Sequence, residues 1–377
     1  MRRGGKIYMN EIEALQASLA VRGNHTRLKR LMKRAEQGEK LHIGFLGGSI
    51  TQGSLASTKE TCYAALVHQW WKKKFPQSEF SYINAGIGGT TSLYGAARTW
   101  EDLMRYRPDF VVVDFTVNDE ATEFFQETYE GVIRQVYGDE TKPAVVIMNN
   151  VYYDTGTNAQ EFHNQIGAYY QIPCISMKDS IYQMIQTGSY KEEEITSDHL
   201  HPNDKGHGLV AEMITHFLDV VYRDINIEEI EPNYPVPMTE NRYEHAKRWQ
   251  ITNCRPKLEG FMTDPRERTA MLDLYKNGWI AERKGEKIIF ELECSGISIQ
   301  YLKSIHQPRP VANAILDGDV AHPIRLDANF DETWGDCLYL QTILHGGEKK
   351  THTLEIEIVQ DSPEQAGEFY LVSIITD

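Results

Sequence analysis

The chain has 377 residues, a length that favours two domains over one. Hydrophobic residues make up 41% and charged residues 25%, as in ordinary globular proteins, and no run approaches the roughly 18 apolar residues of a membrane helix. The net charge of −15 argues against nucleic acid and anionic membranes as partners, because phosphate groups would be repelled.

Two further patterns concern the compartment. The first residues are basic, but no apolar stretch and no small-residue cleavage site follow them, so we do not expect a signal peptide. The cysteines are odd in number and widely spaced, and they form no CxxC pair: Cys62, Cys174, Cys254, Cys294 and Cys337. These features predict free thiols in a reducing compartment, and we therefore expect a cytoplasmic protein.

Strands and helices alternate over the first part of the chain. Short apolar runs, several of them closed by glycine, predict buried strands at 41–48, 80–89, 109–119, 144–149 and 172–176. Amphipathic stretches predict helices at 24–38, 62–74, 94–106, 121–137, 158–170 and 206–224. This alternation predicts a three-layer α/β/α domain at 10–225, with a parallel sheet covered on both faces.

The pattern changes after this domain. Residues 226–239 are acidic and rich in proline, which is typical of a linker. From 240 to 377, β-branched runs separated by Gly, Asp and Pro turns replace the helical pattern. We therefore predict a C-terminal antiparallel β-sandwich, of jelly-roll type, at 240–377.

Polar segments follow the predicted strands, where active sites of open α/β sheets collect. Ser49 lies in GGSIT, directly after the first strand, where a tight turn would expose its hydroxyl. The alternative is a turn with a capping serine. After the next strand, the glycines of NAGIGGT (84–90) would let backbone N–H groups point at a ligand oxygen. A phosphate loop and a purely structural turn are the alternatives there, although neither GxxxxGK[ST] nor GxGxxG with its acidic partner occurs.

Two more segments complete the set. Asn118, in VND, can supply a side-chain N–H to the same oxygen, and the alternative is a helix cap, a role that Asp119 can take instead. In DHLHP, His201 can take a serine proton while Asp198 holds its other ring nitrogen. Pro202 would suit the first turn of the next helix. A zinc site is the alternative, because Asp198, His199, His201 and His207 are all metal-ligand types. We interpret His199 as a residue of the pocket wall or surface.

In this order, GGSIT, NAGIGGT, VND and DHLH resemble the four blocks of the SGNH (GDSL-like) hydrolase superfamily. The resemblance implies that Ser49 is the nucleophile and that Asp198 and His201 complete its triad. It also implies an oxyanion hole made of the Ser49 backbone N–H, Gly89 and Asn118. It implies neither a metal nor an organic cofactor.

Two positions depart from the usual family pattern. Gly48 stands where an acidic residue commonly precedes the serine, and Val117 stands where many members have glycine. With a C-terminal sandwich, the GGSIT variant looks like carbohydrate esterase family 17. Members of that family are cytoplasmic two-domain enzymes that deacetylate mannooligosaccharides, and their second domain resembles a family 35 carbohydrate-binding module.

The expected function is therefore that of a serine carboxylic ester hydrolase that removes acetyl groups from oligosaccharides, with mannooligosaccharides favoured. Trp334, in a polar loop of the second domain, is expected to reach the serine pocket and clamp the sugar. Burial of Trp334 inside the sandwich is the alternative. The alternative functions are an esterase for acetylated xylan or other short acyl esters, and a non-catalytic carbohydrate-binding protein.

Overall fold

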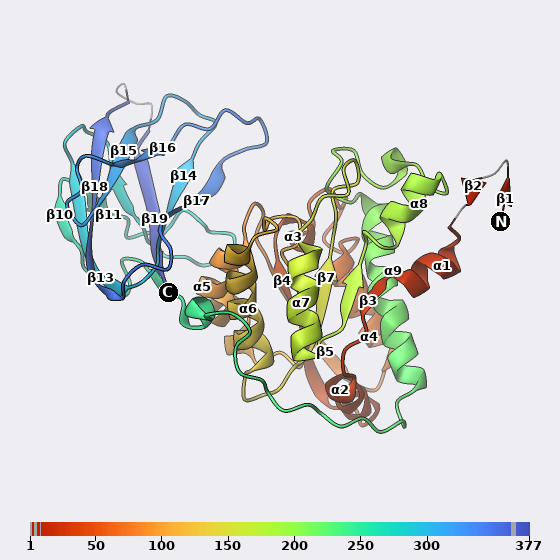
Figure 1. The fold of residues 1–377 in the computed structure, drawn as a ribbon. Coiled ribbons are helices and arrows are strands. Elements are labelled where there is room, and N and C mark those ends of the chain that lie inside the picture. The colour runs from red at the N-terminus through yellow and green to blue at the C-terminus, as the bar shows by residue number, and fades with distance from the viewer. Residues whose placement is uncertain (1, 4–5, 8, 363–366) are drawn as a thin grey trace. The chain divides into compact units, whose positions relative to one another are not determined.

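The structure is a computed structural model that describes residues 2–3, 6–7, 9–362 and 367–377. Two compact units divide the chain, Met1–Glu244 and His245–Asp377 (Figure 1). Each unit has its own hydrophobic core.

The first unit is built on a six-stranded sheet with the order β3-β8-β7-β6-β4-β5. Its strands are β3 (Leu19–Val21), β4 (Lys40–Gly47), β5 (Glu79–Gly86), β6 (Phe110–Asp114), β7 (Ala144–Asn149) and β8 (Cys174–Ser176). All neighbours are parallel except β3, which runs antiparallel to β8 at one edge. The predicted parallel sheet is thus confirmed for five strands, and the three-residue β3 is an addition that the sequence pattern did not reveal.

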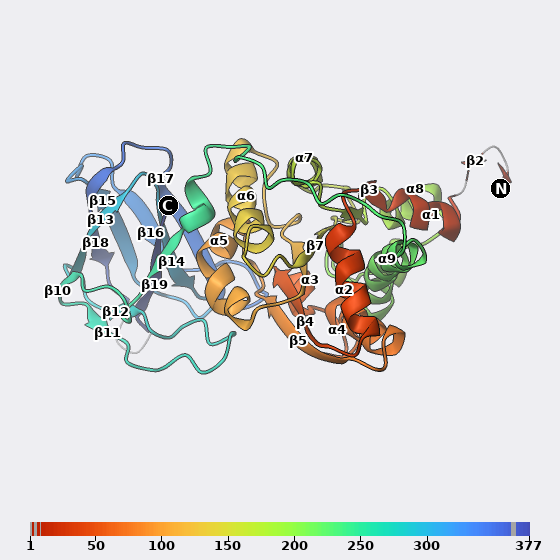
Figure 2. The same cartoon turned by 90° about the horizontal axis from the view of Figure 1, so that it is seen from below.

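Helices cover both faces of this sheet. One layer contains α2 (Thr26–Glu36), α4 (Tyr63–Lys74) and α9 (Asp204–Arg223), and the other contains α5 (Ser92–Asp102), α6 (Glu123–Tyr137) and α7 (Gln160–Tyr170) (Figure 2). All five residues of β6 are buried, as expected for a strand packed on both sides. The predicted α/β/α fold is therefore confirmed.

Short elements complete the first unit. They are β1 (Arg2–Arg3), β2 (Lys6–Ile7), α1 (Glu11–Ala17), α3 (Ser49–Gln52), α8 (Ile181–Thr187) and the 3₁₀ turns Met104–Tyr106 and Glu192–Glu194. A further 3₁₀ turn, Arg242–His245, crosses the boundary to the second unit. The helix predicted at 94–106 is divided, because Leu103 leaves the helical region with φ −135° and a 3₁₀ turn follows it.

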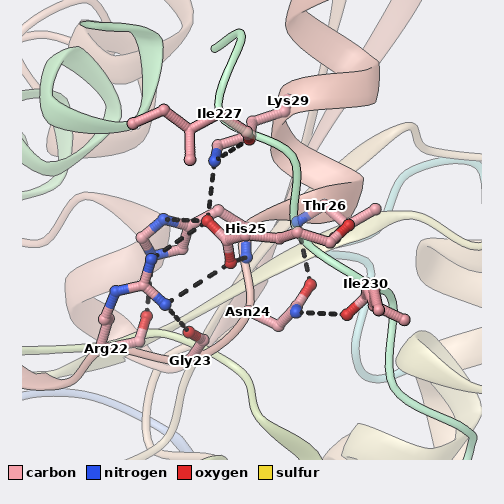
Figure 3. Close-up of polar contacts among 9 residues, drawn as sticks. Arg22, Gly23, Asn24, His25, Thr26, Lys29, Ile227 and Ile230 are labelled. Atoms are coloured by element: carbon pink, nitrogen blue, oxygen red, sulfur yellow. Dashed lines mark hydrogen bonds and ion pairs between the residues drawn. The ribbon is translucent and has the colours of Figure 1, made fainter. Parts of the chain in front are cut away.

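The segment 226–239, predicted as a linker, lies within the first unit; we call it the strap. Near its start, Glu229 accepts hydrogen bonds from Lys29 Nζ at 2.7 Å, Arg22 Nη2 at 3.1 Å and the backbone N–H of His25 at 3.1 Å. Lys29 also donates to the backbone oxygen of Ile227 at 2.9 Å (Figure 3). These contacts fix the start of the strap to the N-terminal end of α2.

The strap is held further along as well. Glu231 pairs with Arg27 at 2.8 Å and with Arg30 at 2.7 Å. At the far end, the buried carboxylate of Glu130 on α6 accepts the backbone N–H groups of Met238 at 2.6 Å and Thr239 at 2.7 Å. The strap therefore has fixed contacts at both ends, unlike a free linker.

The second unit consists of two antiparallel sheets. One has the order β10 (Lys257–Glu259), β13 (Lys287–Cys294), β18 (Lys350–Gln360), β15 (Val311–Leu316) and β16 (Ile324–Asp327). The other has the order β11 (Met262–Thr263), β12 (Trp279–Ala281), β19 (Phe369–Thr376), β14 (Ile297–Lys303) and β17 (Cys337–Leu344), with β9 (Lys247–Trp249) paired to β19.

Side chains from both sheets share one core. Ile288, Phe290 and Leu292 alternate along β13 on its buried face, and Ile297 and Ile299 of the other sheet belong to the same cluster. Alternation with period two along strands packed face to face is the pattern of a sandwich. The predicted antiparallel C-terminal domain is confirmed. In both units, no helix of the described residues has the length and apolar character needed to cross a membrane.

Candidate active site

Ser49 begins α3, two residues after the end of β4, and only 7% of its surface is exposed. The turn before it requires glycine, because a Cβ on Gly47 would lie 2.3 Å from Thr51 Oγ1 and 2.4 Å from the Asp114 backbone oxygen. The left-handed Gly53, with φ 105°, ends this short helix. The serine hydroxyl is therefore held at the carboxyl end of β4, between β6 and the edge strand β5.

A continuous chain of hydrogen bonds joins Ser49 to His201 and Asp198. Ser49 Oγ lies 2.8 Å from His201 Nε2, and His201 Nδ1 lies 2.7 Å from Asp198 Oδ2. A carboxylate only accepts hydrogen bonds, so Nδ1 carries the ring proton and Nε2 is left to accept from the serine. Burial raises the pKa of Asp198, but hydrogen bonds from the His201 ring and the backbone of residues 200–201 outweigh burial and hold this pKa below its usual value.

The loop that carries His201 is closed by backbone contacts. Thr196 and Pro202 form an isolated β-bridge, and Asn203 N–H donates to the Ile195 backbone oxygen at 2.7 Å. Asn203 is the N-cap of α9, and its side chain accepts from Gly206. Pro202 therefore precedes the cap, and its predicted place in the first turn of the helix is wrong, because the bridge keeps the chain extended at that point.

The glycine turn after β5 passes next to the serine. A Cβ on Gly88 would lie 3.6 Å from Ser49 Cβ, and one on Gly86 would lie 2.2 Å from the Gln52 backbone nitrogen. Gly89 is exposed and has φ 67°, a backbone conformation that favours glycine. The structure thus places the predicted donor turn beside the predicted nucleophile.

Asn118 lies against the other side of the serine turn. Its Oδ1 occupies the space in which a Cβ on Gly48 would stand, at 2.2 Å. Within the part of the chain that the structure describes, the Asn118 side-chain amide makes no hydrogen bond and is available to a ligand. Asp119 is buried and accepts the Ser92 N–H at 2.8 Å, so it caps α5 rather than α6, whose N-cap is Thr122.

His199 and His201 do not converge. The His199 ring is 66% exposed and bonds through Nδ1 to Glu192 at 2.5 Å, a contact that raises the pKa of His199. The His201 ring points to Ser49 instead. Across the described ranges, no cluster of three or more His, Cys, Asp or Glu side chains is placed to hold a metal ion. The zinc alternative therefore has no support in this arrangement.

Asp114, the last residue of β6, is a buried carboxyl group that the sequence analysis overlooked. Asn150 Nδ2 donates to its Oδ2 at 2.8 Å, and Thr51 Oγ1 lies 3.4 Å from the same atom. Burial raises the pKa of Asp114 to about 7. A single acidic residue within the apolar run VVVDFT was the signal that could have revealed it.

Arg98 is a second residue that the sequence analysis missed. Its side chain is fully buried and donates to the backbone oxygens of Gly47 at 2.9 Å and Ala85 at 2.8 Å. These oxygens lie near the ends of β4 and β5, directly before the serine and glycine turns. Arg98 therefore ties together the two strand ends from which the site is built.

Trp334 belongs to the second unit. Its side chain is 61% exposed, and its ring lies edge to face with Phe330 at a centroid distance of 5.0 Å. The alternative that Trp334 is buried inside the sandwich is wrong. The buried tryptophan of that core is Trp279.

Comparisons with known proteins agree with this geometry. Residues 45–209 match the GDSL-like Lipase/Acylhydrolase family. Two solved structures of a two-domain esterase (CEX) active on acetylated mannans, one co-crystallized with mannopentaose, are 50% identical in sequence to this chain. They cover 96% of it, with TM-scores of 0.93 and 0.94, and the match spans 97% and 98% of their own chains.

A more distant relative matches about half of the chain. The acetylxylan esterase of Geobacillus stearothermophilus is 25% identical over 203 residues, which are 46% of this chain and 91% of the relative. Identity of 50% across nearly the full length of both chains, together with the family match over the serine, asparagine and histidine blocks, fixes the assignment. The chain belongs to the GDSL-like lipase/acylhydrolase family and is a carboxylic ester hydrolase.

Proposed function

We propose that this protein removes O-acetyl groups from acetylated oligosaccharides, with manno-oligosaccharides as the preferred substrates. The hydrogen-bonded chain from Ser49 Oγ through His201 to Asp198 carries the proposal. Such a chain activates a serine toward an ester carbonyl, and it uses no metal or organic cofactor.

In the first step, Ser49 Oγ attacks the acetyl carbonyl carbon while its proton passes to His201 Nε2. The tetrahedral intermediate then collapses, the bond to the sugar oxygen breaks, and that oxygen takes the proton from Nε2. The acetyl group remains on Ser49. Asp198 stays ionised and stabilises the imidazolium that forms.

In the second step, water attacks the acetyl-enzyme and its proton passes to His201. Collapse of the second intermediate releases acetate and returns the proton to Ser49 Oγ. In both intermediates, the negative oxygen is held by the backbone N–H groups of Ser49 and Gly89 and by the Asn118 amide. The free Asn118 side chain supports this role, and Asn118→Ala is expected to lower kcat by about 10²–10³.

A direct test separates catalysis from simple binding. Ser49→Ala should abolish acetate release and labelling by a serine-reactive phosphonate. Labelling of the wild type at Ser49 would exclude the alternative of a non-catalytic carbohydrate-binding protein. Unchanged hydrolysis by Ser49→Ala would reject the assignment of the nucleophile.

The glycan is proposed from similarity to the two-domain esterase active on acetylated mannans. Acetylated xylan is the second candidate, because the distant relative is an acetylxylan esterase. Acetylated manno-, xylo- and cello-oligosaccharides compared by acetate release should rank manno-oligosaccharides first in kcat/KM. A higher kcat/KM on xylo-oligosaccharides would favour the second candidate.

We also propose that the second unit acts as a carbohydrate-binding module and that Trp334 clamps the sugar. The exposure of its ring and the supporting edge contact with Phe330 suit stacking on an apolar sugar face. Trp334→Ala should raise KM on acetylated oligosaccharides and leave hydrolysis of 4-nitrophenyl acetate unchanged. Trp100→Ala, a change at a tryptophan of similar exposure (58%) on α5, serves as the control. Equal losses on both substrates would reject the clamp.

Two smaller assignments complete the proposal. His199, two residues before His201 and largely exposed, is proposed to contact the glycan; His199→Ala should then raise KM on oligosaccharides only.

A cytoplasmic location is proposed because all five cysteines, each within the described ranges, are free thiols. Fractionation of the native host, with detection by antibody, tests the location.

A further inference from the structure

Gln52 connects the helix of the serine to the glycine turn after β5. It is the last residue of α3, three positions after Ser49 on the same short helix, and it is exposed. Its Oε1 accepts the backbone N–H of Gly88 at 2.6 Å. An exposed glutamine is ordinarily solvated by water, whereas this one links the helix of the serine to the glycine turn.

The peptide group that receives this contact is held at both ends. On one side, Gly88 N–H donates to Gln52. On the other, the Ile87 backbone oxygen accepts from Thr90 Oγ1 at 2.6 Å. The Ile87 N–H also donates to the Gly47 backbone oxygen at 3.0 Å, on the strand that leads to Ser49. With the 87–88 peptide plane fixed, only the two backbone torsions of Gly88 set the direction of the Gly89 N–H.

The turn lies close to the reacting hydroxyl. A Cβ on Gly88 would lie 3.1 Å from Gln52 Oε1 and 3.6 Å from Ser49 Cβ, so the turn runs directly beside the serine and the glutamine. An oxyanion donor is effective when it lies about 2.7–3.1 Å from the developing charge. A small displacement of this turn would therefore weaken the donor.

We propose that Gln52 is a positioning residue that sets the Gly88–Gly89 turn relative to Ser49, so that the Gly89 N–H meets the oxyanion. The assignment rests on the proposed acyl-transfer function. Gln52 touches neither the substrate nor the oxyanion and acts through the Gly88 peptide. Its contribution belongs to the transition state, so it should appear in kcat rather than in ground-state binding.

The test compares two substitutions with a matched control. Gln52→Met keeps the length of the side chain but removes the acceptor, and Gln52→Asn keeps the amide but is one methylene too short to reach Gly88. The control is Gln69→Met on α4, where another exposed glutamine makes one hydrogen bond to a backbone oxygen, that of Glu60. Because both glutamines are exposed, all three variants should fold with melting temperatures within about 2 °C of the wild type.

Both Gln52 variants should lose about tenfold in kcat on 4-nitrophenyl acetate, less than outright loss of a donor, with KM within about twofold of the wild type. The Ki of phenylboronic acid, which forms a tetrahedral adduct on serine, should rise by a similar factor. A fraction of unfolded enzyme would lower the rate per total protein but would leave this Ki unchanged. Gln69→Met should match the wild type in kcat and Ki.

The assignment is overturned if Gln52→Met retains the kcat and boronate Ki of Gln69→Met. Ser49→Ala measured alongside separates the two claims. If Ser49→Ala is inactive while Gln52→Met is unaffected, only the proposed role of Gln52 is rejected. If Ser49→Ala remains active, the acyl-transfer proposal is rejected together with the role of Gln52.

Discussion

Asp198 holds His201 through both of its carboxylate oxygens. Oδ1 accepts the backbone N–H of His201 at 2.8 Å, and Oδ2 accepts the ring Nδ1–H at 2.7 Å. The first contact orients the chain and the second orients the imidazole, which explains how two residues only three positions apart form the proposed catalytic pair. A histidine held in this way presents Nε2 to Ser49.

Asp198→Asn is expected to leave the conformation of the loop unchanged and to lower kcat. The asparagine Oδ1 can still accept the backbone N–H groups, but its NH₂ group would then face Nδ1 and force the ring proton onto Nε2. That tautomer cannot accept the Ser49 proton, and kcat should fall by about 10³–10⁴. The measurement is acetate release, with circular dichroism to verify the fold.

Asp198→Ala provides the comparison, because it removes the backbone contact as well as the ring contact. It should lower the melting temperature more than Asp198→Asn does. An Asp198→Asn variant with wild-type kcat would show that the carboxylate does not set the tautomer.

Gly48 accounts for one of the departures from the family pattern. Since a Cβ at this position would lie 2.2 Å from Asn118 Oδ1, the acidic residue common in relatives does not fit beside Asn118 as it is placed here. Gly48→Asp should displace the Asn118 side chain and lower kcat by about 10²–10³, as removal of Asn118 itself would. The double variant Gly48→Asp with Asn118→Ala should lose little more than either single variant. Fully multiplicative losses would contradict a shared mechanism.

Asp114 should make stability depend on pH. Its pKa of about 7 in the folded protein lies above the ordinary value of 3.8, so the folded state binds more protons than the unfolded state between these values. The free energy of unfolding therefore falls as pH rises from about 4 to about 7, with a slope of roughly 1.4 kcal/mol per pH unit across this interval.

Asp114→Asn removes this titration and can still accept the hydrogen bond from Asn150. Its melting temperature relative to the wild type should rise as pH increases from 4 to 7 and then level off. Thermal unfolding of both proteins in buffers from pH 5 to pH 8.5 checks this. Parallel curves for the two proteins would mean that Asp114 does not titrate in this range.

The sequence pointed to this site because three of its four blocks lie at the ends of β4, β5 and β6, and the carboxyl ends of parallel strands meet at one edge of a sheet. The fourth block, DHLH, lies before α9, and the sequence predicted its role from its residue types. It did not reveal the contact between Gln52 and Gly88, because that contact depends on how two turns face each other. The register of β4 against β5, which pairs Gly47 with Gly86, decides this alignment. Adjacent parallel strands have no tight turn to fix their register, so no local pattern encodes it.

The contacts of the strap could not be predicted for a related reason. The composition of the strap, rich in proline and acidic residues, predicts an extended backbone, and this local prediction is correct. The charges that hold it, such as Lys29 for Glu229, lie about 200 positions earlier in the chain, and a local pattern cannot show which charges meet. Similarly, the sequence around Asp114 did not show that its carboxyl group has a buried partner, because Asn150 comes from another strand end.

Glu229→Gln should therefore destabilise the first unit. Lys29, whose side chain is only 7% exposed, would lose the negative charge that compensates it, although its bond to Ile227 would remain. Breaking one side of a buried, charged contact costs about 1–3 kcal/mol, which should lower the melting temperature by several degrees at pH 7. Glu228→Gln, the same change at the exposed neighbouring residue, is the control and should have little effect.

The pH dependence of the difference in melting temperature between the wild type and Glu229→Gln shows whether the ionised Glu229 carboxylate causes it. Burial raises the pKa of Glu229, but hydrogen bonds from Lys29, the His25 backbone and Arg22 outweigh burial and lower this pKa to about 2. A lowered pKa stabilises the fold above the ordinary value of about 4.5, and this contribution is lost as pH falls toward 2. The gap in melting temperature between the wild type and Glu229→Gln should thus be full at pH 7 and narrow below about pH 4.5. A gap that stays constant down to pH 3 would show that the ionised carboxylate does not hold the strap.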